Sequence, residues 1–134
     1  METFRWAVRV YYEDTDVGGV VYYANYLKFM ERARTEWLRS LGFEQDRLAR
    51  EAGIVFAVTE VELRFQRPAR FNDALCVTAR VSERRRVSLV FEQAVLRGQE
   101  SLCAGRIRIA SLDTASFRPR PIPDALLKGF SDVD

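Results

Sequence analysis

The residues of this sequence most able to do chemistry stand together near its N-terminus, in the stretch VYYEDTDVGGVVYYANYLKF. The stretch contains three acids, Glu13, Asp14 and Asp16. The glycine pair Gly18 and Gly19 follows them. Acids this close repel one another, so either the loop is simply solvated or one carboxylate has a chemical task.

The absence of histidine restricts that chemistry. It excludes Ser-His-Asp and Cys-His hydrolases and every zinc site that uses imidazole. Two cysteines, Cys76 and Cys103, are too few for an all-thiolate zinc site, and we interpret both as small buried thiols of a reducing compartment. Acid–base chemistry is left to carboxylates, tyrosines, lysine or the backbone, and we expect no metal or redox cofactor.

Two alternatives use a pair of acids. Asp14, Asp16 and Gly19 fall at positions 1, 3 and 6 of an EF-hand loop, but Asn25 stands where a bidentate glutamate is needed. The order Asp-Thr-Asp after a strand also fits an aspartate phosphatase, in which one aspartate attacks phosphorus. Such phosphatases need a parallel sheet, which the downstream pattern of successive strands contradicts.

A third hypothesis places one carboxylate beside the start of the helix that follows. The first amides of a helix are unpaired and carry partial positive charge, so they can stabilise an oxyanion that develops on a carbonyl. A neighbouring carboxylate could attack this carbonyl or activate a water molecule. Together with the helix amides, it would supply the groups that acyl transfer needs without histidine. A solvated loop remains the plain alternative.

The elements that must position these groups follow from hydrophobic periodicity. Alternation predicts a strand over residues 4–12, and three- and four-residue steps predict a helix over 22–41 that Gly42 ends. Its apolar stripe comprises Tyr22, Tyr26, Met30, Ala33, Trp37 and Leu41. A short helix is predicted over 44–52, and a short helical turn in the tail. Four further strands are predicted at 55–65, 74–83, 86–97 and 101–112.

This order, one strand, one long helix and four successive strands, predicts an α+β fold. Short links favour antiparallel pairing, and the sheet must curve around the single long apolar helix. We expect one domain over residues 1–134. Edge strands and an exposed face favour a homo-oligomer.

Composition and charge limit the kinds of partner that we expect this protein to bind. The net charge is only +2, from 21 basic and 19 acidic residues, which gives no case for nucleic acid. No apolar run approaches the length of a membrane span and no signal peptide is recognisable, so we expect a cytoplasmic protein. Arginines concentrate in SERRRVS and FRPRP, which favours a local anion site.

The segment RVYYEDTDVGGVVYYANYLKFMERARTEWL closely resembles the opening of the YbgC-type, Tol-Pal-associated acyl-CoA thioesterases, in the 4-hydroxybenzoyl-CoA thioesterase group of hotdog proteins. The resemblance continues through FQRPARFNDAL and RRRVSLVFEQAVLR, and so covers most of the chain. It implies a hotdog fold, a long helix wrapped by a five- or six-stranded antiparallel sheet, with two subunits in the active unit.

The resemblance also implies residue roles. Asp16 matches the catalytic carboxylate, as nucleophile or general base, and the backbone N–H of Tyr23 matches the donor that polarises the thioester carbonyl. Tyr12 matches a tyrosine that orients the aspartate loop or the substrate. Glu13 and Asp14 match no role and are interpreted as solvated. Many members have histidine at the position of Tyr23, a departure that removes any imidazole and leaves the acyl preference open.

Further positions are expected to bind substrate. Arg85 and Ser88 match contacts to the coenzyme phosphates, and guanidinium groups bind phosphate oxygens well. Gly19, Val20 and Tyr26 stand beside the helix start, where they could line an acyl pocket, although the stripe containing Tyr26 is interpreted first as core.

The resulting expectation is an acyl-CoA thioesterase that needs no cofactor other than its coenzyme A substrate. It is expected to form a homodimer or a homotetramer of paired dimers. The first alternative is a non-catalytic module that binds acyl-CoA or acyl carrier protein. The second is a hotdog dehydratase, which the lack of histidine disfavours.

Overall fold

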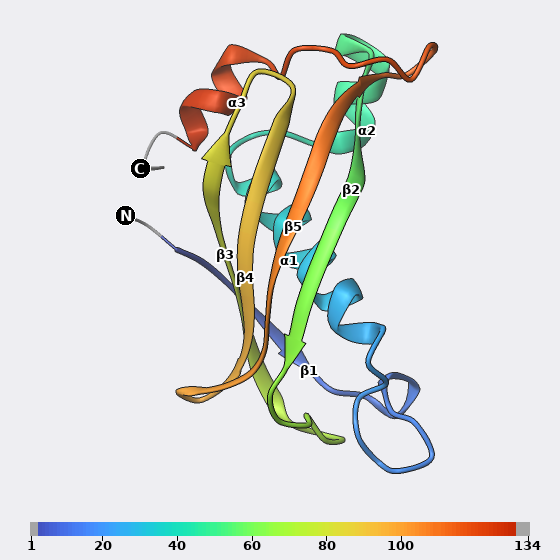
Figure 1. The fold of residues 1–134 in the computed structure, drawn as a ribbon, viewed down its shortest axis with the longest axis vertical. Helices are drawn as coiled ribbons and strands as arrows, with labels where there is room; N and C mark the ends of the chain where they lie inside the picture. Colours follow the sequence, from blue (N-terminus) through green and yellow to red (C-terminus); the bar gives the residue numbers. More distant parts are fainter. Residues whose placement is uncertain (1–2, 131–134) are drawn as a thin grey trace.

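Five antiparallel strands make one sheet in the computed structural model, which describes residues 3–130 (Figure 1). They are β1 (Phe4–Arg9), β2 (Ile54–Phe65), β3 (Ala74–Arg84), β4 (Ser88–Arg97) and β5 (Glu100–Asp113). The order across the sheet is β1-β3-β4-β5-β2, so β1 and β2 form its two edges. The expected α+β architecture of the hotdog type, with its antiparallel sheet, is confirmed.

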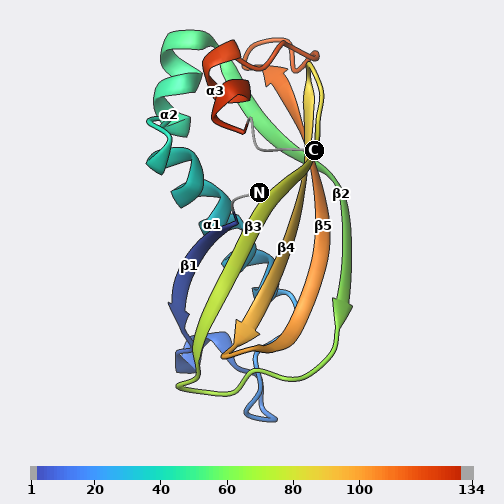
Figure 2. The ribbon, with the colours of Figure 1, turned by 90° about the vertical axis from the view of Figure 1, so that its left-hand side faces the viewer.

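The long helix α1 (Asn25–Ser40) lies along one face of this sheet (Figure 2). It is followed by α2 (Gln45–Arg47), which continues as one turn of π-helix (Leu48–Ala52), and α3 (Asp124–Gly129) comes after the last strand. The opposite face of the sheet carries no helix from residues 3–130, as both views show. No helix of that range is long and apolar enough to cross a bilayer.

Gly42, just after α1, determines where this helix ends. Gly42 has φ +92°, its N–H donates to the carbonyl of Arg39, and the N–H of Phe43 donates to the carbonyl of Leu38 at 2.9 Å. This pattern is a Schellman motif, which uses the left-handed residue to pair the last free carbonyls of a helix. The predicted cap at Gly42 is confirmed.

The buried face of α1 carries most of the predicted apolar stripe. Tyr26, Met30 and Ala33 are at most 3% exposed, and Trp37 packs edge-on against Phe91 at 6.0 Å. The stripe was wrong at its first position, because Tyr22 is 45% exposed and precedes the helix.

Two predicted boundaries near the acidic stretch were wrong. The strand predicted over 4–12 ends at Arg9, and a 3-10 turn (Tyr12–Asp14) replaces its last residues, because the Asp14 carboxylate accepts the Tyr11 N–H at 2.8 Å and turns the chain. The helix predicted from 22 begins at Asn25. The other strands agree with prediction within about one or two residues at each end.

Candidate active site

Asp16 stands at the base of a small hairpin-like loop. Thr15 pairs with Val21, the Asp16 N–H donates to the carbonyl of Val20 at 2.9 Å, and the Asp16 carbonyl accepts the N–H of Gly19. Gly19 has φ +78°, a conformation that costs glycine little and other residues more. The acidic stretch is therefore an ordered turn with the carboxylate of Asp16 at its surface.

One oxygen of that carboxylate is held by the backbone. Oδ1 of Asp16 accepts the N–H of Gly18 at 2.8 Å, while Oδ2 accepts no hydrogen bond from any of residues 3–130. A carboxylate fixed through one oxygen, with the other one free, is oriented to attack a carbonyl or to take a proton from water.

Asp14 has a different role from the one expected, because it is only 8% exposed and not solvated. Besides its side-chain bond to the Tyr11 N–H, its carbonyl accepts the Tyr22 N–H and the side-chain amide of Asn25, both at 2.9 Å. Asp14 thereby ties the acidic loop to the start of α1. Glu13, in contrast, is exposed as expected.

The start of α1 presents free backbone donors. No side chain caps the helix, and the N–H groups of Tyr23 and Ala24 donate to no acceptor within residues 3–130. These amides sit at the positive end of the helix dipole, where a carbonyl oxygen that gains negative charge is stabilised. Asp14 therefore joins the loop that carries Asp16 to the start of the helix that carries these donors.

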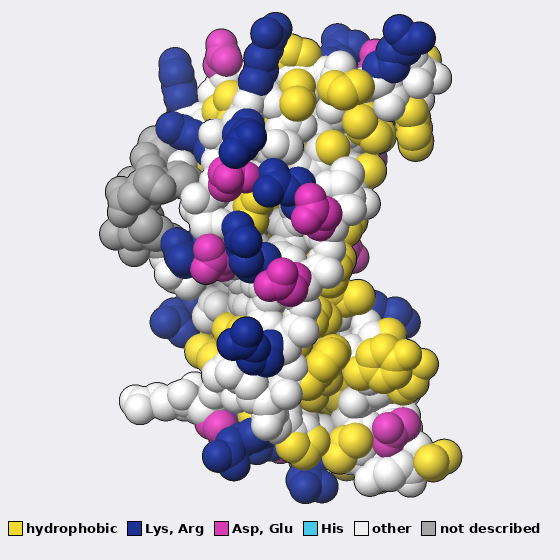
Figure 3. Space-filling view, viewed as in Figure 1, with side chains coloured by type: hydrophobic (Ala, Val, Ile, Leu, Met, Phe, Trp, Pro, Cys, Tyr) yellow, Lys and Arg dark blue, Asp and Glu magenta, His cyan; other side chains and the backbone are white. Residues whose placement is uncertain are grey.

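An aromatic patch surrounds the helix start. Figure 3 shows hydrophobic side chains gathered at the lower right, next to the C-terminal end of β2. Tyr23 is 62% exposed and meets Phe65 edge-on at 6.2 Å, and Tyr22 lies against Tyr23 at 4.8 Å. Their side-chain hydrogen bond raises the pKa of Tyr22. Apolar exposure of this extent is typical of a surface that a substrate or subunit covers.

The other residues that were predicted near the start of α1 differ in how far they are buried. Tyr12 is exposed and stacks on Phe71 at 3.8 Å, and its carbonyl accepts the Thr15 N–H. Val20 is half-buried and pairs with Arg70. Tyr26 is buried, its hydroxyl accepts the Ala69 N–H at 3.0 Å, and burial raises its pKa. The structure therefore gives Tyr26 the packing role that was the first interpretation of its stripe.

Several known proteins are similar to this chain in sequence and in fold. The Thioesterase superfamily matches residues 18–104, which include all of α1, the strands β2, β3 and β4, and the beginning of β5. The acyl-CoA thioester hydrolase YbgC of Escherichia coli O157:H7 is 40% identical over 128 residues, which are 95% of each chain. The chain belongs to the thioesterase superfamily.

Two further comparisons support this membership. The acyl-CoA thioesterase YbgC of Haemophilus influenzae is 40% identical over 95% of this chain and 93% of its own length. The crystal structure of a probable thioesterase from Bartonella henselae superimposes with a TM-score of 0.86 at 35% identity, over 91% of this chain and 100% of that one. The resemblance drawn from the opening segment is confirmed.

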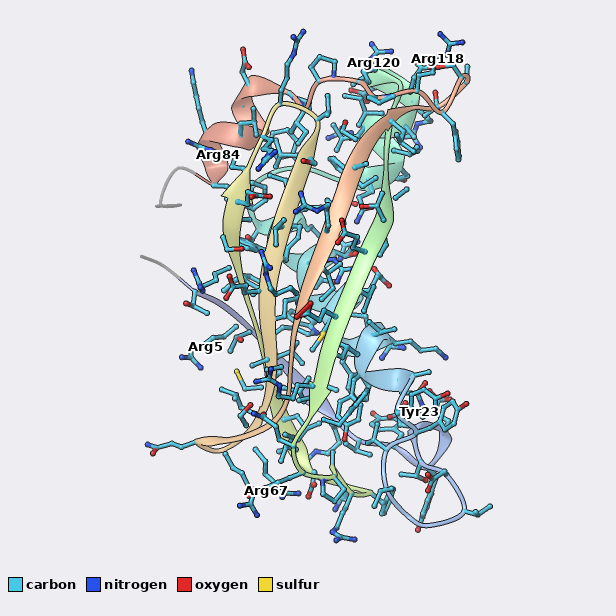
Figure 4. The ribbon with its side chains drawn as sticks, in the orientation of Figure 1. Arg5, Tyr23, Arg67, Arg84, Arg118 and Arg120 are labelled. Carbon is cyan, nitrogen blue, oxygen red and sulfur yellow. The ribbon has the colours of Figure 1, made fainter. Side chains whose placement is uncertain are left out.

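The arginine-rich hairpin of this thioesterase lies at the other end of the sheet from the start of α1. Figure 4 shows Arg84 and Tyr23 at opposite ends of the sheet. Arg85 and Ser88 belong to the same hairpin as Arg84, since the Arg85 N–H donates to the Ser88 carbonyl at 2.9 Å. One chain alone therefore does not bring the two predicted halves of the site together.

The hairpin end has the chemistry expected for phosphate. A hollow of about 340 Å³ is lined by Arg84, Arg85, Arg86 and Lys128, with Asp124 and Leu127. Arg84 is oriented by its bond to the Leu127 carbonyl at 2.7 Å, and Arg85 pairs with Glu83 at 3.1 Å. Lys128 comes from α3, which sequence analysis interpreted only as a helical turn in the tail.

The alternatives that use two acids or a thiol do not fit this site. The side chain of Asp14 turns to the Tyr11 N–H and does not converge with Asp16, and the sheet is antiparallel, against the calcium and phosphatase hypotheses. Both cysteines are free thiols; Cys103 is buried as interpreted, whereas Cys76 is only partly buried. Burial raises the pKa of the Cys103 thiol to about 11, so it is not a nucleophile.

Sequence analysis missed Asn25 and Phe65 at this site. Asn25 is the first residue of α1, is 8% exposed and bonds the Asp14 carbonyl. The sequence contained a sign of this role, because Asn25 places a polar amide at the start of an otherwise apolar helix face, where it needs a hydrogen-bond partner. Phe65 reaches Tyr23 from a strand forty residues away, and only the fold could show that contact.

Proposed function

We propose that this protein hydrolyses acyl-CoA thioesters to a free acid and coenzyme A. The observation that carries the proposal is that Asp14 joins two segments, one with the free carboxylate oxygen of Asp16 and one with the unpaired amides of Tyr23 and Ala24. Relatives at 40% identity bear the name acyl-CoA thioesterase, and this supports the same substrate class here.

The proposed chemistry uses both groups. The thioester carbonyl oxygen accepts the Tyr23 N–H, which stabilises the oxyanion of the tetrahedral intermediate. Asp16 takes a proton from the attacking water, or attacks the carbonyl carbon itself and leaves the acyl group on its oxygen until water hydrolyses the anhydride. In either route the carbon–sulfur bond breaks and coenzyme A leaves as a thiolate that gains a proton.

A second copy of the chain is needed to complete this site. The edge strand β2 exposes Val58, Val61 and Phe65, each at least 44%, and its outer edge has no strand from residues 3–130 beside it. Pairing of two β2 edges in antiparallel fashion would join the sheets and reverse the partner end for end. That reversal would carry the partner's Arg85 hairpin toward Asp16, and its arginines would bind the coenzyme phosphates.

Replacement of Asp16 tests the catalytic assignment. With a panel of short, long and aromatic acyl-CoA substrates and a thiol reagent, Asp16→Asn should lower kcat about 10²–10⁴-fold, the usual contribution of a general base. Glu13→Gln, which changes an exposed acid three residues away, is the matched control and should keep full turnover. Saturable coenzyme A binding with no thiol release from the unmodified protein would instead establish a binding module.

Replacement of Arg85 tests the phosphate assignment separately. Arg85→Ala should raise KM for an acyl-CoA several-fold and leave kcat unchanged, because it removes contacts that ground and transition states share. An acyl-pantetheine substrate lacks the nucleotide phosphates, so its KM should not change. An equal effect on both substrates would contradict the role of Arg85.

A further inference from the structure

One buried arginine of α1 has a neutral side chain as its hydrogen-bond partner. Arg34 is 9% exposed, and its Nη1 donates to Oε1 of Gln93 at 2.9 Å. It forms no ion pair with any acid of residues 3–130, and Glu31, one turn earlier, accepts the Thr35 hydroxyl at 2.6 Å instead. The guanidinium carbon lies 5.9 Å from the centre of the Phe91 ring. Burial lowers the pKa of Arg34, as expected for a cation taken out of water.

Gln93 connects this arginine to the backbone of α1. It is 4% exposed and lies in β4, on the face of the sheet that α1 covers (Figure 2). Its Nε2 donates to the Met30 carbonyl at 3.0 Å and to the Thr78 carbonyl of β3 at 3.3 Å. A helix carbonyl already accepts the N–H four residues later, so the bond from Gln93 is additional to the bonding of the helix. We call Arg34 and Gln93 the polar pair.

Stability does not account for the polar pair. A buried charge without an acid beside it costs free energy, and apolar side chains of similar volume at such a place are often equally or more stabilising. The surroundings are apolar, since Phe29, Met30 and Ala33 of the helix and Val95 of β4 are each at most 1% exposed. What the pair adds is direction, because a hydrogen bond fixes two groups relative to each other and apolar contact alone does not.

The polar pair holds α1 to the centre of the sheet. Other bonds from the start of the helix reach loops, since Asn25 donates to the Asp14 carbonyl and Tyr26 accepts the Ala69 N–H. Gln93, in contrast, belongs to β4, the middle strand of the five. Its two bonds therefore fix where α1 lies along the sheet.

The position of α1 along the sheet matters because of the free amides before its first turn. Met30 follows Asn25, the first residue of the helix, by five residues, which is about 7.5 Å along the helix axis. A helix is stiff over so short a length, so a shift at Met30 carries the N–H groups of Tyr23 and Ala24 with it. These are the groups that donate to no acceptor within residues 3–130.

We propose that Gln93, held in place by Arg34, is a positioning residue for thioester hydrolysis. It fixes α1 on the sheet so that the amides of Tyr23 and Ala24 meet the oxygen of the thioester carbonyl. The inference rests on the proposed function, and the polar pair acts through the helix and not on the substrate. A displacement of about 1 Å in such a donor can lower a rate by roughly 10²-fold.

Replacement of both members by apolar side chains separates position from stability. The double variant Arg34→Met with Gln93→Leu leaves no buried charge unpaired, so its free energy of unfolding in urea should equal or exceed that of the unmodified protein. Its kcat should nevertheless fall by about 10–10²-fold. KM for an acyl-CoA should not change, because the lost alignment concerns the transition state. Arg32→Met, at an exposed site on the same helix, is the control and should keep full turnover.

Gln93→Glu separates the two bonds of the glutamine. A carboxylate accepts hydrogen bonds from Arg34 and neutralises its charge, but it cannot donate to the carbonyls of Met30 and Thr78. If Gln93 positions the helix, kcat falls in this variant as it does in the double variant. If Gln93 serves only to satisfy Arg34, the variant keeps its turnover and the inference is overturned.

NMR of the backbone amides tests the positioning without reference to turnover. The amide resonances of Tyr23 and Ala24 should shift in the double variant and in Gln93→Glu, and should keep their positions in Arg32→Met. Unchanged resonances, or an unchanged kcat in the double variant, would overturn the inference even where hydrolysis itself is observed. Absence of thiol release from the unmodified protein would instead overturn the proposed function, whatever the resonances show.

Discussion

Asp14 and Asp16 stand two residues apart and have opposite surroundings. Asp14 is buried, and both its carboxylate and its carbonyl are used to hold the loop against α1. Asp16 is exposed and leaves one carboxylate oxygen without a donor from residues 3–130. A buried acid that binds backbone N–H groups within the fold serves structure, and an exposed, oriented acid can serve chemistry.

The oxyanion donor can be tested at Tyr23 because proline removes a backbone N–H. Tyr23→Pro should lower kcat about 10²–10³-fold, the usual cost of one oxyanion donor. Tyr23→Phe keeps the amide and should keep kcat within a few-fold. Circular dichroism should show intact helix in both variants, since proline is tolerated at helix starts. Equal losses in both would place the role in the hydroxyl instead.

At the scale of the elements, the close packing of strand β2 against strand β5 depends on a glycine in β5. Gly105 of β5 aligns with Leu63, and a Cβ on this glycine would lie 2.3 Å from Leu63 Cδ2 and 2.7 Å from the Glu62 carbonyl oxygen. The contact with backbone cannot be relieved by a rotamer change. The strands β2 and β5 can approach this closely only because residue 105 lacks a side chain.

Gly105→Ala should therefore destabilise the protein by about 1–3 kcal/mol, the usual cost of overpacking. Urea unfolding followed by circular dichroism measures the change. Ala110→Ser adds one atom on the opposite face of the same strand and should cost much less. A wild-type free energy of unfolding in Gly105→Ala would contradict the close approach of β2.

The turn after β5 depends on Asp113. Its carboxylate accepts the backbone N–H of Ser116 and of Ala115 and binds Arg120 at 2.8 Å, and these contacts, the Ser116 N–H first, hold its pKa down to about 2. The folded-state pKa is below the unfolded value of about 3.9, so the charged carboxylate stabilises the fold above that pH.

Asp113→Asn should lower Tm near neutral pH. Because the stabilisation is lost as pH falls through the folded-state pKa, the difference in Tm between the two proteins should shrink from pH 4 toward pH 2. Thermal unfolding at several pH values in this range measures it. A difference that stays constant with pH would show that the charge of Asp113 is not what stabilises the turn.

For the whole molecule, the separation of the loop before α1 from the β3–β4 hairpin is the main consequence of the fold, and Figure 4 shows Tyr23 and Arg84 at opposite ends of the sheet. The loop before α1 and the β3–β4 hairpin lie at opposite ends of strands of at least ten residues. Such strands span roughly 30 Å, more than any side chain can bridge. A site that uses both ends needs two chains.

Val61→Lys tests that requirement. Val61 is 44% exposed on the edge strand, and a charge there should prevent two β2 edges from pairing. We expect the molar mass by light scattering to fall to half or less and turnover to be lost, although Asp16 and Tyr23 are unchanged. Phe117→Lys, at an exposed apolar site in the turn after β5, should affect neither. An active Val61→Lys monomer would contradict the shared site.

The local sequence by itself determined which segments form strands, the long helix with its Gly42 cap, and the acidic stretch before that helix, while the choice of Asp16 within it came from the family resemblance. These depend on periodicity and turn chemistry within a few residues, which a sequence displays directly. Only the tertiary structure decided that Asp14 is buried, that Phe65 meets Tyr23, and that the hairpin after β3 lies at the opposite end of the sheet from Tyr23. The reason is physical: such contacts join segments tens of residues apart, and their distances depend on sheet order and strand length rather than on local pattern.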